Sequence, residues 1–96
     1  MDEGESEWDA TKAEGNLVKH GVGFEAARCV FDDVFAFEWC DFDSAPGEIR
    51  YVITGMVNDV ILTVVYTERG ERTRVISARR ATKHEQEEYY RSQTAE

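Results

Sequence analysis

The sequence predicts a single α+β domain with two N-terminal helices, an antiparallel sheet of three to four strands, and a C-terminal helix. Three observations support this prediction. Near the N-terminus, apolar residues recur at helical spacing between a capping aspartate and a glycine; alternation typical of strands dominates the middle; and a capping box precedes the last charged segment. A chain of 96 residues with 42% hydrophobic and 32% charged residues suits one small globular domain.

The first residues of the chain are acidic. Residues 1–6 hold no apolar residue beyond Met1, so we expect an acidic flexible tail before a domain at residues 7–92. The start lacks the basic and apolar regions of a signal peptide, and no apolar run is long enough to span a membrane. We therefore expect the protein in the cytoplasm, with Cys29 and Cys40 as reduced packing residues.

The first helix is expected from Ala10 to Lys19, because Asp9 is a good N-cap and Gly21 can end the helix in the left-handed conformation. Ala10, Ala13 and Leu17 share one face of this helix, and Lys12, Asn16 and Lys19 share another. A second short helix is expected from about Phe24 to Phe31, where apolar residues again recur at helical spacing.

The period then changes to that of strands. The segment Val34 to Trp39 is a possible fourth strand, followed by a loop that holds the only proline, Pro46. The stronger strands are Ile49 to Val57, Val60 to Thr67 and Thr73 to Arg79. Asn58-Asp59 predicts a tight hairpin between the first two, and Gly70 predicts a second turn within Arg69 to Arg72.

The last helix is expected from Lys83 to Ser92. Thr82 and Glu85 stand three residues apart, which is the spacing of a capping box. The segment contains no aliphatic residue, so Tyr89 and Tyr90 supply its only bulky apolar surface. We expect this helix to lie against the sheet through its tyrosines.

Charge is distributed unevenly along the chain. The formal net charge is −9, and residues 1–10 carry five acids and no base. Residues 68–80 carry five arginines against two glutamates, which leaves +3. The arginines are Arg69, Arg72, Arg74, Arg79 and Arg80. A basic segment on an acidic chain favours an anionic partner, and we expect the stretch Thr67 to Tyr89 to contact the phosphate backbone of RNA.

Arg79 and Arg80 lie where a strand ends and a helix begins. Guanidinium groups beside the unpaired N–H groups of a helix N-terminus form a suitable phosphate site. The alternative is that these arginines are solvated and paired with Glu68, Glu71 or Glu85, as surface charges commonly are.

Three further residues are candidates for proton transfer. Glu85 and Tyr89 stand four apart and share a helix face, where both could approach a bound phosphate. Each also has a structural alternative, Glu85 in the capping box and Tyr89 in packing. His20 suits general acid or base chemistry, although an imidazole at a helix C-terminus can equally bond the last carbonyl groups. His84 and Glu88 lack a third ligand, so we expect no metal and no cofactor.

Two patterns in the sequence belong together. The first half carries Glu7-Trp8-Asp9, Lys12, Asn16, Lys19-His20-Gly21-Val22, Phe24, Ala27 and Phe31-Asp32-Asp33. The second half carries Thr67-Glu68-Arg69-Gly70, Arg74-Val75-Ile76-Ser77-Ala78-Arg79-Arg80-Ala81, Glu85 and Tyr89. In this order, over about residues 7–90, they resemble the BrnT family of ribonuclease toxins.

The resemblance implies a compact RelE-like fold and a metal-independent endoribonuclease that inhibits translation. It implies a BrnA-type antitoxin with a ribbon-helix-helix domain, through which the toxin reaches DNA only indirectly. Arg79 and Arg80 would stabilise the scissile phosphate, with Glu85 or His20 as the base and Tyr89 orienting or stacking. Lys19, Arg69 and Arg74 would bind substrate.

One departure concerns the last helix. Toxins of this kind are usually basic there, whereas this chain reads Lys83-His84-Glu85-Gln86-Glu87-Glu88. Weaker attraction to RNA follows from the added negative charge. The alternative function is therefore a catalytically weak or inactive member that acts mainly as an antitoxin-binding module in the regulation of its own operon.

Overall fold

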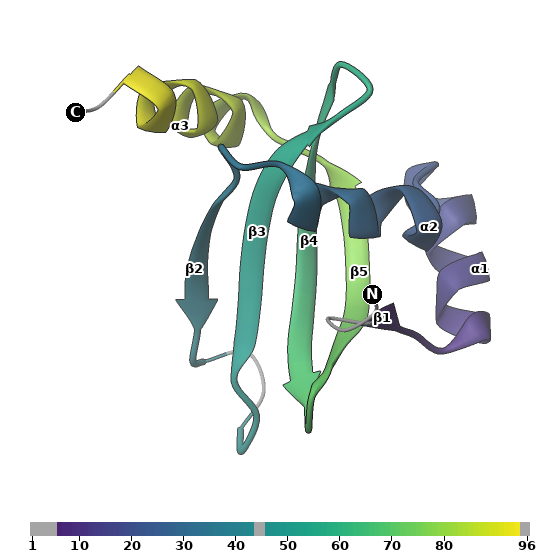
Figure 1. The fold of residues 1–96 in the computed structure, drawn as a ribbon. Helices are drawn as coiled ribbons and strands as arrows, with labels where there is room; N and C mark the ends of the chain where they lie inside the picture. The colour runs from purple at the N-terminus through teal and green to yellow at the C-terminus, as the bar shows by residue number, and fades with distance from the viewer. Residues whose placement is uncertain (1–5, 44–45, 95–96) are drawn as a thin grey trace.

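The structure is a computed structural model that describes residues 6–43 and 46–94. Along the chain follow β1 (Ser6–Glu7), α1 (Ala10–His20), α2 (Phe24–Ala27), the 3₁₀ helix η1 (Arg28–Asp32), β2 (Phe37–Asp41), β3 (Arg50–Val57), β4 (Val60–Arg69), β5 (Arg72–Arg80) and α3 (Lys83–Thr94). The five strands form one sheet in the order β1-β5-β4-β3-β2 (Figure 1). The predicted α+β class is confirmed.

The sheet is mixed, whereas three to four antiparallel strands were predicted. The additional strand is β1, which pairs in parallel with β5 through Ser6 opposite Thr73 and Glu7 opposite Arg74. Two residues are too few for a two-residue period to be visible in the sequence. Of the predicted tail, residues 1–5 lie outside the described residues, and Ser6 belongs to β1.

The predicted caps of α1 are confirmed, and the helix ends at His20, one residue after the predicted Lys19. The Asp9 carboxylate accepts hydrogen bonds from the backbone N–H groups of Thr11 at 2.8 Å and Lys12 at 3.3 Å. Gly21 follows the helix with φ of 72°, and its N–H donates to the carbonyl of Leu17 at 2.8 Å. These caps satisfy backbone groups that have no partner inside the helix.

The predicted faces of α1 are wrong at two residues. Asn16, expected on one face with Lys12 and Lys19, is buried at 8% exposure, while Leu17, expected on the face of Ala10 and Ala13, is 52% exposed. The Asn16 amide nitrogen donates to the carbonyls of Val22 at 3.0 Å and Ala78 at 2.8 Å, and its oxygen accepts from the Ala78 N–H at 3.2 Å. Buried backbone groups need hydrogen-bond partners, and the Asn16 amide is the partner of those of Val22 and Ala78. The side of α1 that carries Asn16 therefore faces β5.

The second predicted helix is divided into α2 and η1, and the following strand begins later than predicted. Phe24, Ala27 and Val30 are buried as expected. The strand shift is caused by Asp33, whose carboxylate accepts from the Phe35 N–H at 2.9 Å and whose carbonyl accepts from the Ala36 N–H at 3.0 Å. This turn delays β2 to Phe37–Asp41.

Both predicted hairpins are confirmed. Asn58 and Asp59 have φ of 51° and 70°, the left-handed pair that a two-residue connection requires, and Val57 pairs with Val60. The second turn contains Gly70 with φ of 60°.

β5 contains a bulge that strict alternation does not predict. Ser77 pairs with Val65, but the next β4 residue, Tyr66, pairs with Val75, so Ile76 is the extra residue. Strict alternation along the strand would place Arg74 on the same face as Arg80. The bulge instead places Arg74 with Arg79 on one side of β5 and the buried Val75 and Ala78 with Arg80 on the other.

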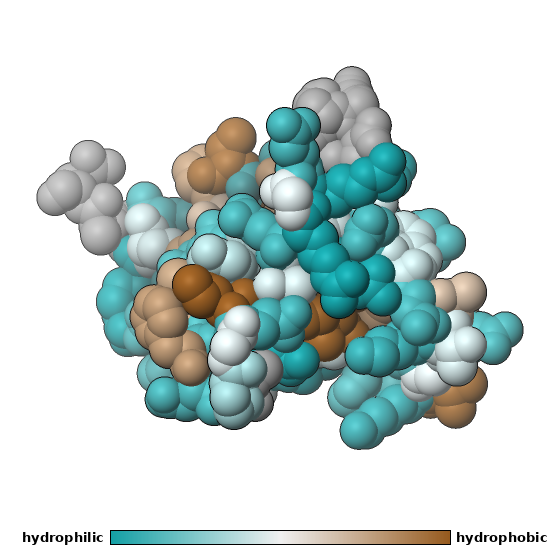
Figure 2. All heavy atoms as spheres, turned by 90° about the horizontal axis from the view of Figure 1, so that it is seen from below, coloured by the Kyte–Doolittle hydropathy of each residue, from teal (hydrophilic) through white to brown (hydrophobic). Residues whose placement is uncertain are grey.

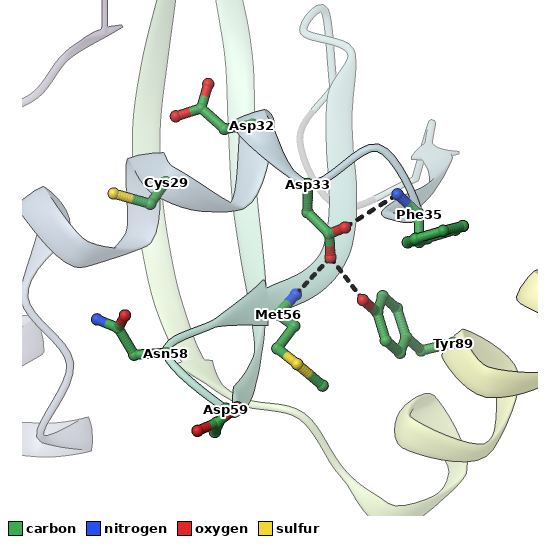
Figure 3. Close-up of a pocket in the computed structure, with 8 residues that line it drawn as sticks. All are labelled: Cys29, Asp32, Asp33, Phe35, Met56, Asn58, Asp59 and Tyr89. Atoms are coloured by element: carbon green, nitrogen blue, oxygen red, sulfur yellow. Dashed lines mark hydrogen bonds between the residues drawn. The ribbon is translucent and has the colours of Figure 1, made fainter.

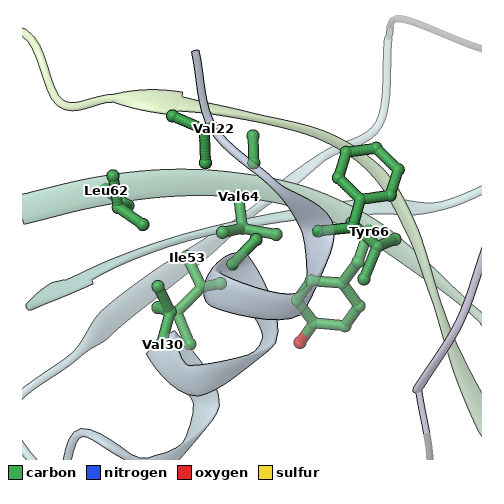
Figure 4. Close-up of a cluster of buried hydrophobic side chains, with 10 residues drawn as sticks. Val22, Val30, Ile53, Leu62, Val64 and Tyr66 are labelled. Atoms are coloured by element: carbon green, nitrogen blue, oxygen red, sulfur yellow. The ribbon is translucent and has the colours of Figure 1, made fainter. Parts of the chain in front are cut away.

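The sheet has two different faces. α1, α2 and η1 pack on the face that we call the α1 face, where ten buried residues form the main core (Figure 4). They are Val22, Phe24, Ala27, Val30, Ile53, Leu62, Val64, Tyr66, Val75 and Ala78. α3 packs on one end of the opposite face, the α3 face, where Tyr89, Ile61 and Ala81 form a second small cluster with Phe37 and Met56.

At the end of the sheet opposite α3, hydrophobic side chains form separate patches among hydrophilic ones (Figure 2). Within residues 6–43 and 46–94, no helix is long and apolar enough to cross a membrane. The longest described helix, α3, has 12 residues.

Candidate functional site

A bidentate ion pair joins the end of β5 to the first turn of α3. The two terminal nitrogens of Arg79 lie 2.8 and 2.9 Å from the two carboxylate oxygens of Glu85. Parallel N–H···O bonds of this kind fix the plane of a guanidinium group as well as its position. Arg79 is therefore held rigidly on the α3 face.

Glu85 is itself held from two directions. Its Oε1 atom accepts from the Thr82 backbone N–H at 2.9 Å, while the Thr82 hydroxyl accepts from the Glu85 N–H at 3.1 Å, so the predicted capping box is present. The same oxygen accepts from the Thr63 hydroxyl at 2.9 Å, and that hydroxyl lies 2.8 Å from the hydroxyl of Thr54. Thr54 and Thr63 are buried under α3, so this polar chain is anchored inside the protein.

These contacts determine the protonation of the pair. The hydrogen bond from Arg79, with those from Thr82 and Thr63, lowers the pKa of Glu85 to about 2 against the effect of burial. The same hydrogen bond raises the pKa of Arg79. A carboxylate this acidic is a poor proton acceptor near neutral pH. The geometry thus makes Glu85 the group that positions Arg79.

Arg79 retains donors for a ligand. Of the five guanidinium N–H groups, two bond Glu85 and one donates to the Arg80 carbonyl at 3.3 Å, which leaves two among contacts with the described residues. The Arg79 side chain is 38% exposed. It can therefore donate to an anion at the surface without leaving Glu85.

Alternation and the β5 bulge place further arginines on the α3 face. Arg74 lies 3.1 Å from Glu7, Arg72 lies 3.9 Å from the same carboxylate, and Arg50 lies 3.3 Å from Glu48. Arg69, opposite Arg72 in the register, is exposed at the far hairpin. Arg79 is paired with a carboxylate as well, but its pair is bidentate, so the plane of its guanidinium group is better fixed than that of the other described arginines of this face.

His20, Lys19 and Arg80 lie on the other side of the strand. Glu7 is level with Arg74 and Asn16 with Ala78, so α1 and β5 run in the same direction side by side (Figure 1). The last turn of α1 and the last residue of β5 are consequently at the same end of the sheet, and all three side chains are exposed. Arg79 and Arg80 thus lie on opposite faces of one strand end.

Tyr89 is part of a separate site. Its side chain is 3% exposed, and its hydroxyl donates to Asp33 Oδ2 at 2.6 Å (Figure 3). The same oxygen accepts from the Met56 N–H at 2.7 Å. Burial and this hydrogen bond raise the pKa of Tyr89 to about 12. Burial raises the pKa of Asp33, but the bonds from Tyr89, Met56 and Phe35 outweigh it and hold that pKa below its usual value. Tyr89 therefore anchors α3 and does not adjoin Arg79.

A pocket of about 420 Å³ lies beside the Tyr89–Asp33 contact. It is lined by Cys29, Asp32, Asp33, Phe35, Met56, Asn58, Asp59 and Tyr89 (Figure 3). In the part of the chain that the structure describes, no three His, Cys, Asp or Glu side chains are grouped so as to hold a metal ion.

Two residues that organise the site were not predicted as site residues. The Thr63 hydroxyl donates to Glu85, and the Asp33 carboxylate accepts from the Tyr89 hydroxyl. A threonine pair opposite each other on neighbouring strands, Thr54 and Thr63, is a signal that was visible once the predicted hairpin fixed the register. No comparable signal links Asp33 to Tyr89, which lie 56 residues apart.

A sequence model of the ribonuclease toxin BrnT, of type II toxin-antitoxin systems, matches residues 8–85 of the chain. The chain belongs to the BrnT family. No curated protein matches it. The BrnT match includes Arg79 and Arg80 and ends at Glu85, so Tyr89 lies beyond it. The family is one of ribonucleases, and its type II toxin-antitoxin context implies a protein antitoxin as partner.

Proposed function

We propose that this BrnT-family chain is the toxin of a type II pair, a metal-independent endoribonuclease that cleaves RNA in the cytoplasm and inhibits translation. The single observation that carries the proposal is the Arg79 guanidinium, fixed by Glu85 at a strand end with N–H groups left for a phosphate. The partner is a BrnA-type antitoxin with a ribbon-helix-helix domain, which alone contacts DNA. The α+β fold is of the RelE-like kind.

In the proposed reaction, the ribose 2′-oxygen attacks the adjacent phosphorus and the bond to the 5′-oxygen breaks. A base takes the proton of the 2′-hydroxyl, and the leaving 5′-oxygen gains a proton. The products are a 2′,3′-cyclic phosphate and a free 5′-hydroxyl, so the reaction needs neither water nor a redox partner. Negative charge accumulates on the phosphoryl oxygens in the transition state, and a pre-positioned guanidinium stabilises it there.

The residues divide into roles by their positions. Arg79 binds the scissile phosphate, and Arg80, on the opposite side of the strand end, binds a neighbouring one. His20 lies exposed on the same side of the strand end as Arg80, and it contacts the RNA beside the phosphate that Arg80 binds. Glu85 positions Arg79, because a pKa of about 2 makes it a poor base.

The remaining candidates act less directly. Tyr89 holds α3, and with it Glu85, through Asp33. Lys19, Arg69 and Arg74 contribute to substrate attraction over longer distances. Arg74 contributes least of these, since Glu7 already pairs with it.

The test uses the purified full chain and a single-stranded RNA. We expect cleavage that persists in excess EDTA and yields 2′,3′-cyclic phosphate ends. Arg80→Ala and His20→Ala should each lower the rate while the folded state is retained, whereas Arg28→Ala, an exposed arginine outside the site, should cleave at the parental rate. Loss of cleavage on adding EDTA would contradict metal independence.

A second candidate function, that of an antitoxin-binding module, is favoured by the acidic side chains of α3 and by the paired arginines of the sheet. Glu85, Glu87 and Glu88 make α3 acidic, and several arginines of the sheet are already paired with carboxylates. Both features weaken attraction to RNA. If the folded protein binds its antitoxin but neither cleaves RNA nor slows growth on induction, the chain serves as an antitoxin-binding module in operon regulation.

A further inference from the structure

The two edges of the sheet are built differently. One edge is β1, which has two residues and carries the charged Glu7. The other is β2, whose five residues pair with β3 and, among residues 6–43 and 46–94, with no second strand (Figure 1). Natural proteins usually protect a long edge strand with lysine, proline or a bulge, because unpaired backbone groups attract other strands. β2, Phe-Glu-Trp-Cys-Asp, has neither lysine nor proline.

The backbone groups that β2 presents outward can be identified from the hairpin. In a two-residue loop the flanking residues, here Val57 and Val60, form a hydrogen-bonded pair, and such pairs alternate along an antiparallel ladder. Gly55 and Ile53 therefore bond β4, while Val52 and Thr54 bond β2 through Trp39 and Phe37. The Met56 N–H fits this direction, because it points to Asp33 and not to β4.

The N–H and C=O groups of Glu38 and Cys40 consequently point away from β3. Together they offer two donors and two acceptors to an added strand. Strand addition of this kind takes its affinity from main-chain bonds and its specificity from neighbouring side chains.

The side chains around this edge are apolar and acidic. Val34, Phe35, Trp39 and Phe42 are exposed by 87%, 54%, 50% and 68%, and they lie before, within and after β2. The segment 32–43 contains five acids, Asp32, Asp33, Glu38, Asp41 and Asp43, and no lysine, arginine or histidine. Its formal charge is thus −5 over twelve residues, beside several exposed large hydrophobic side chains.

We infer that the outer edge of β2 receives an extended basic segment of the antitoxin as a sixth strand. Its apolar residues lie on Trp39 and Phe42, and its cations lie beside the exposed acids Asp32 and Asp43. The inference rests on the antitoxin partner of the proposed function. A second copy of this chain fits worse, because pairing β2 with itself would oppose two segments of charge −5.

Hydrogen exchange on the full chain, free and saturated with the protein encoded beside it, tests the inference directly. The Glu38 and Cys40 amides should exchange rapidly in the free toxin and be protected at least about tenfold more in the complex. Unchanged exchange of both amides in a verified complex would overturn the inference, as would their protection in free toxin that forms dimers.

Variants provide the second measurement. Cys40→Pro removes one outward N–H, which an edge strand tolerates, while Cys40→Ser keeps it. Cys40→Pro should raise the Kd for the antitoxin about tenfold or more, and Cys40→Ser should leave it within about twofold. Equal Kd values for the two variants would contradict strand addition.

The contribution of the acidic side chains is tested with substitutions that leave the backbone hydrogen bonds of β2 unchanged. Asp43→Lys places a cation beside the edge, and Glu14→Lys makes the same change on the exposed surface of α1. Asp43→Lys should weaken antitoxin binding at least about fivefold more than Glu14→Lys in low salt, and less in high salt. Equal effects would contradict the charge complementarity. RNA cleavage by the free toxin is independent of all these readouts, so the proposed activity and this interface can fail separately.

Discussion

The guanidinium group of Arg79 and the carboxylate of Glu85 meet through two hydrogen bonds of 2.8 and 2.9 Å across the junction of β5 and α3. The pair joins the strand end to the capping box of the following helix, and it is anchored below by the hydroxyl of Thr63. One carboxylate therefore orients the arginine and begins the helix. Because of this double role, stability and activity should change together when Glu85 is altered.

Glu85→Gln should destabilise the protein by about 1 to 3 kcal/mol at neutral pH, because a charge-assisted bond inside a polar cluster is replaced by a neutral one. The pKa of Glu85 is about 2 in the folded state and 4.5 ordinarily. Its contribution is complete above about pH 4.5 and is lost as the pH falls towards 2. Denaturation from pH 7 to 2 should show a smaller decline for Glu85→Gln than for the parent. Parallel curves would contradict this assignment.

Asn16→Ala should destabilise the protein by about 2 to 4 kcal/mol, because buried carbonyls of Val22 and Ala78 and the Ala78 N–H lose their partner. Lys12→Ala, an exposed position on the same helix, is the control and should change stability by less than about 0.5 kcal/mol. Urea denaturation of both variants measures the difference. Similar values for the two would show that the amide does not orient α1.

Tyr89→Phe should cost about 1 kcal/mol and leave RNA cleavage within about twofold, since the hydroxyl serves Asp33. The pKa of Tyr89 is raised from 10.0 to about 12, so the folded state keeps a proton that the unfolded state loses. The contribution of the Tyr89 hydroxyl to the stability of the folded state is complete below pH 10 and declines as the pH rises towards 12. The exposed neighbour provides the control, Tyr90→Phe. A large loss of cleavage in Tyr89→Phe alone would instead place the phenol at the reacting phosphate.

Gly55→Ala should destabilise the protein by about 1 to 3 kcal/mol through overpacking. A Cβ at this position would lie 3.0 Å from side-chain atoms of Ala36 and Val30, between β3 and η1. Gly15→Ala in α1 would meet nothing within 4 Å and should stabilise by about 0.5 to 1 kcal/mol through helix propensity. Thermal unfolding of the two variants measures whether each substitution lowers or raises the stability. A stable Gly55→Ala variant would mean that η1 can move away from the sheet.

Local signals predicted much of the fold. Asp9, Gly21, Asn58-Asp59 and the Thr82–Glu85 box act within a few residues of themselves, and the structure confirms each. Features that depend on distant partners were not predictable in this way. Asn16 is buried because Ala78, 62 residues away, needs a partner, and the Ile76 bulge exists only relative to β4.

The candidate site shows the same division. The sequence predicted that Arg79 and Glu85 lie near each other, because both adjoin one strand-to-helix junction. It did not predict that the bulge separates Arg80 from Arg74, nor that Tyr89 turns to Asp33. The register of β5 and the packing of α3 are needed to place the catalytic candidates. They put Arg79 with Glu85 on the α3 face, His20 with Arg80 on the other side of the strand, and Tyr89 beside Asp33.

In the proposed reaction, Arg79 is held by Glu85 and stabilises the scissile phosphate. This role is tested by single-turnover cleavage of a single-stranded RNA by the parent, Arg79→Ala, Arg79→Lys and the exposed control Arg28→Ala. We predict that Arg79→Ala lowers the rate at least about 100-fold and that Arg79→Lys restores only part of it, because lysine lacks the planar pair of donors. Arg28→Ala should cleave at the parental rate. Parental cleavage by a folded Arg79→Ala variant would contradict the claim.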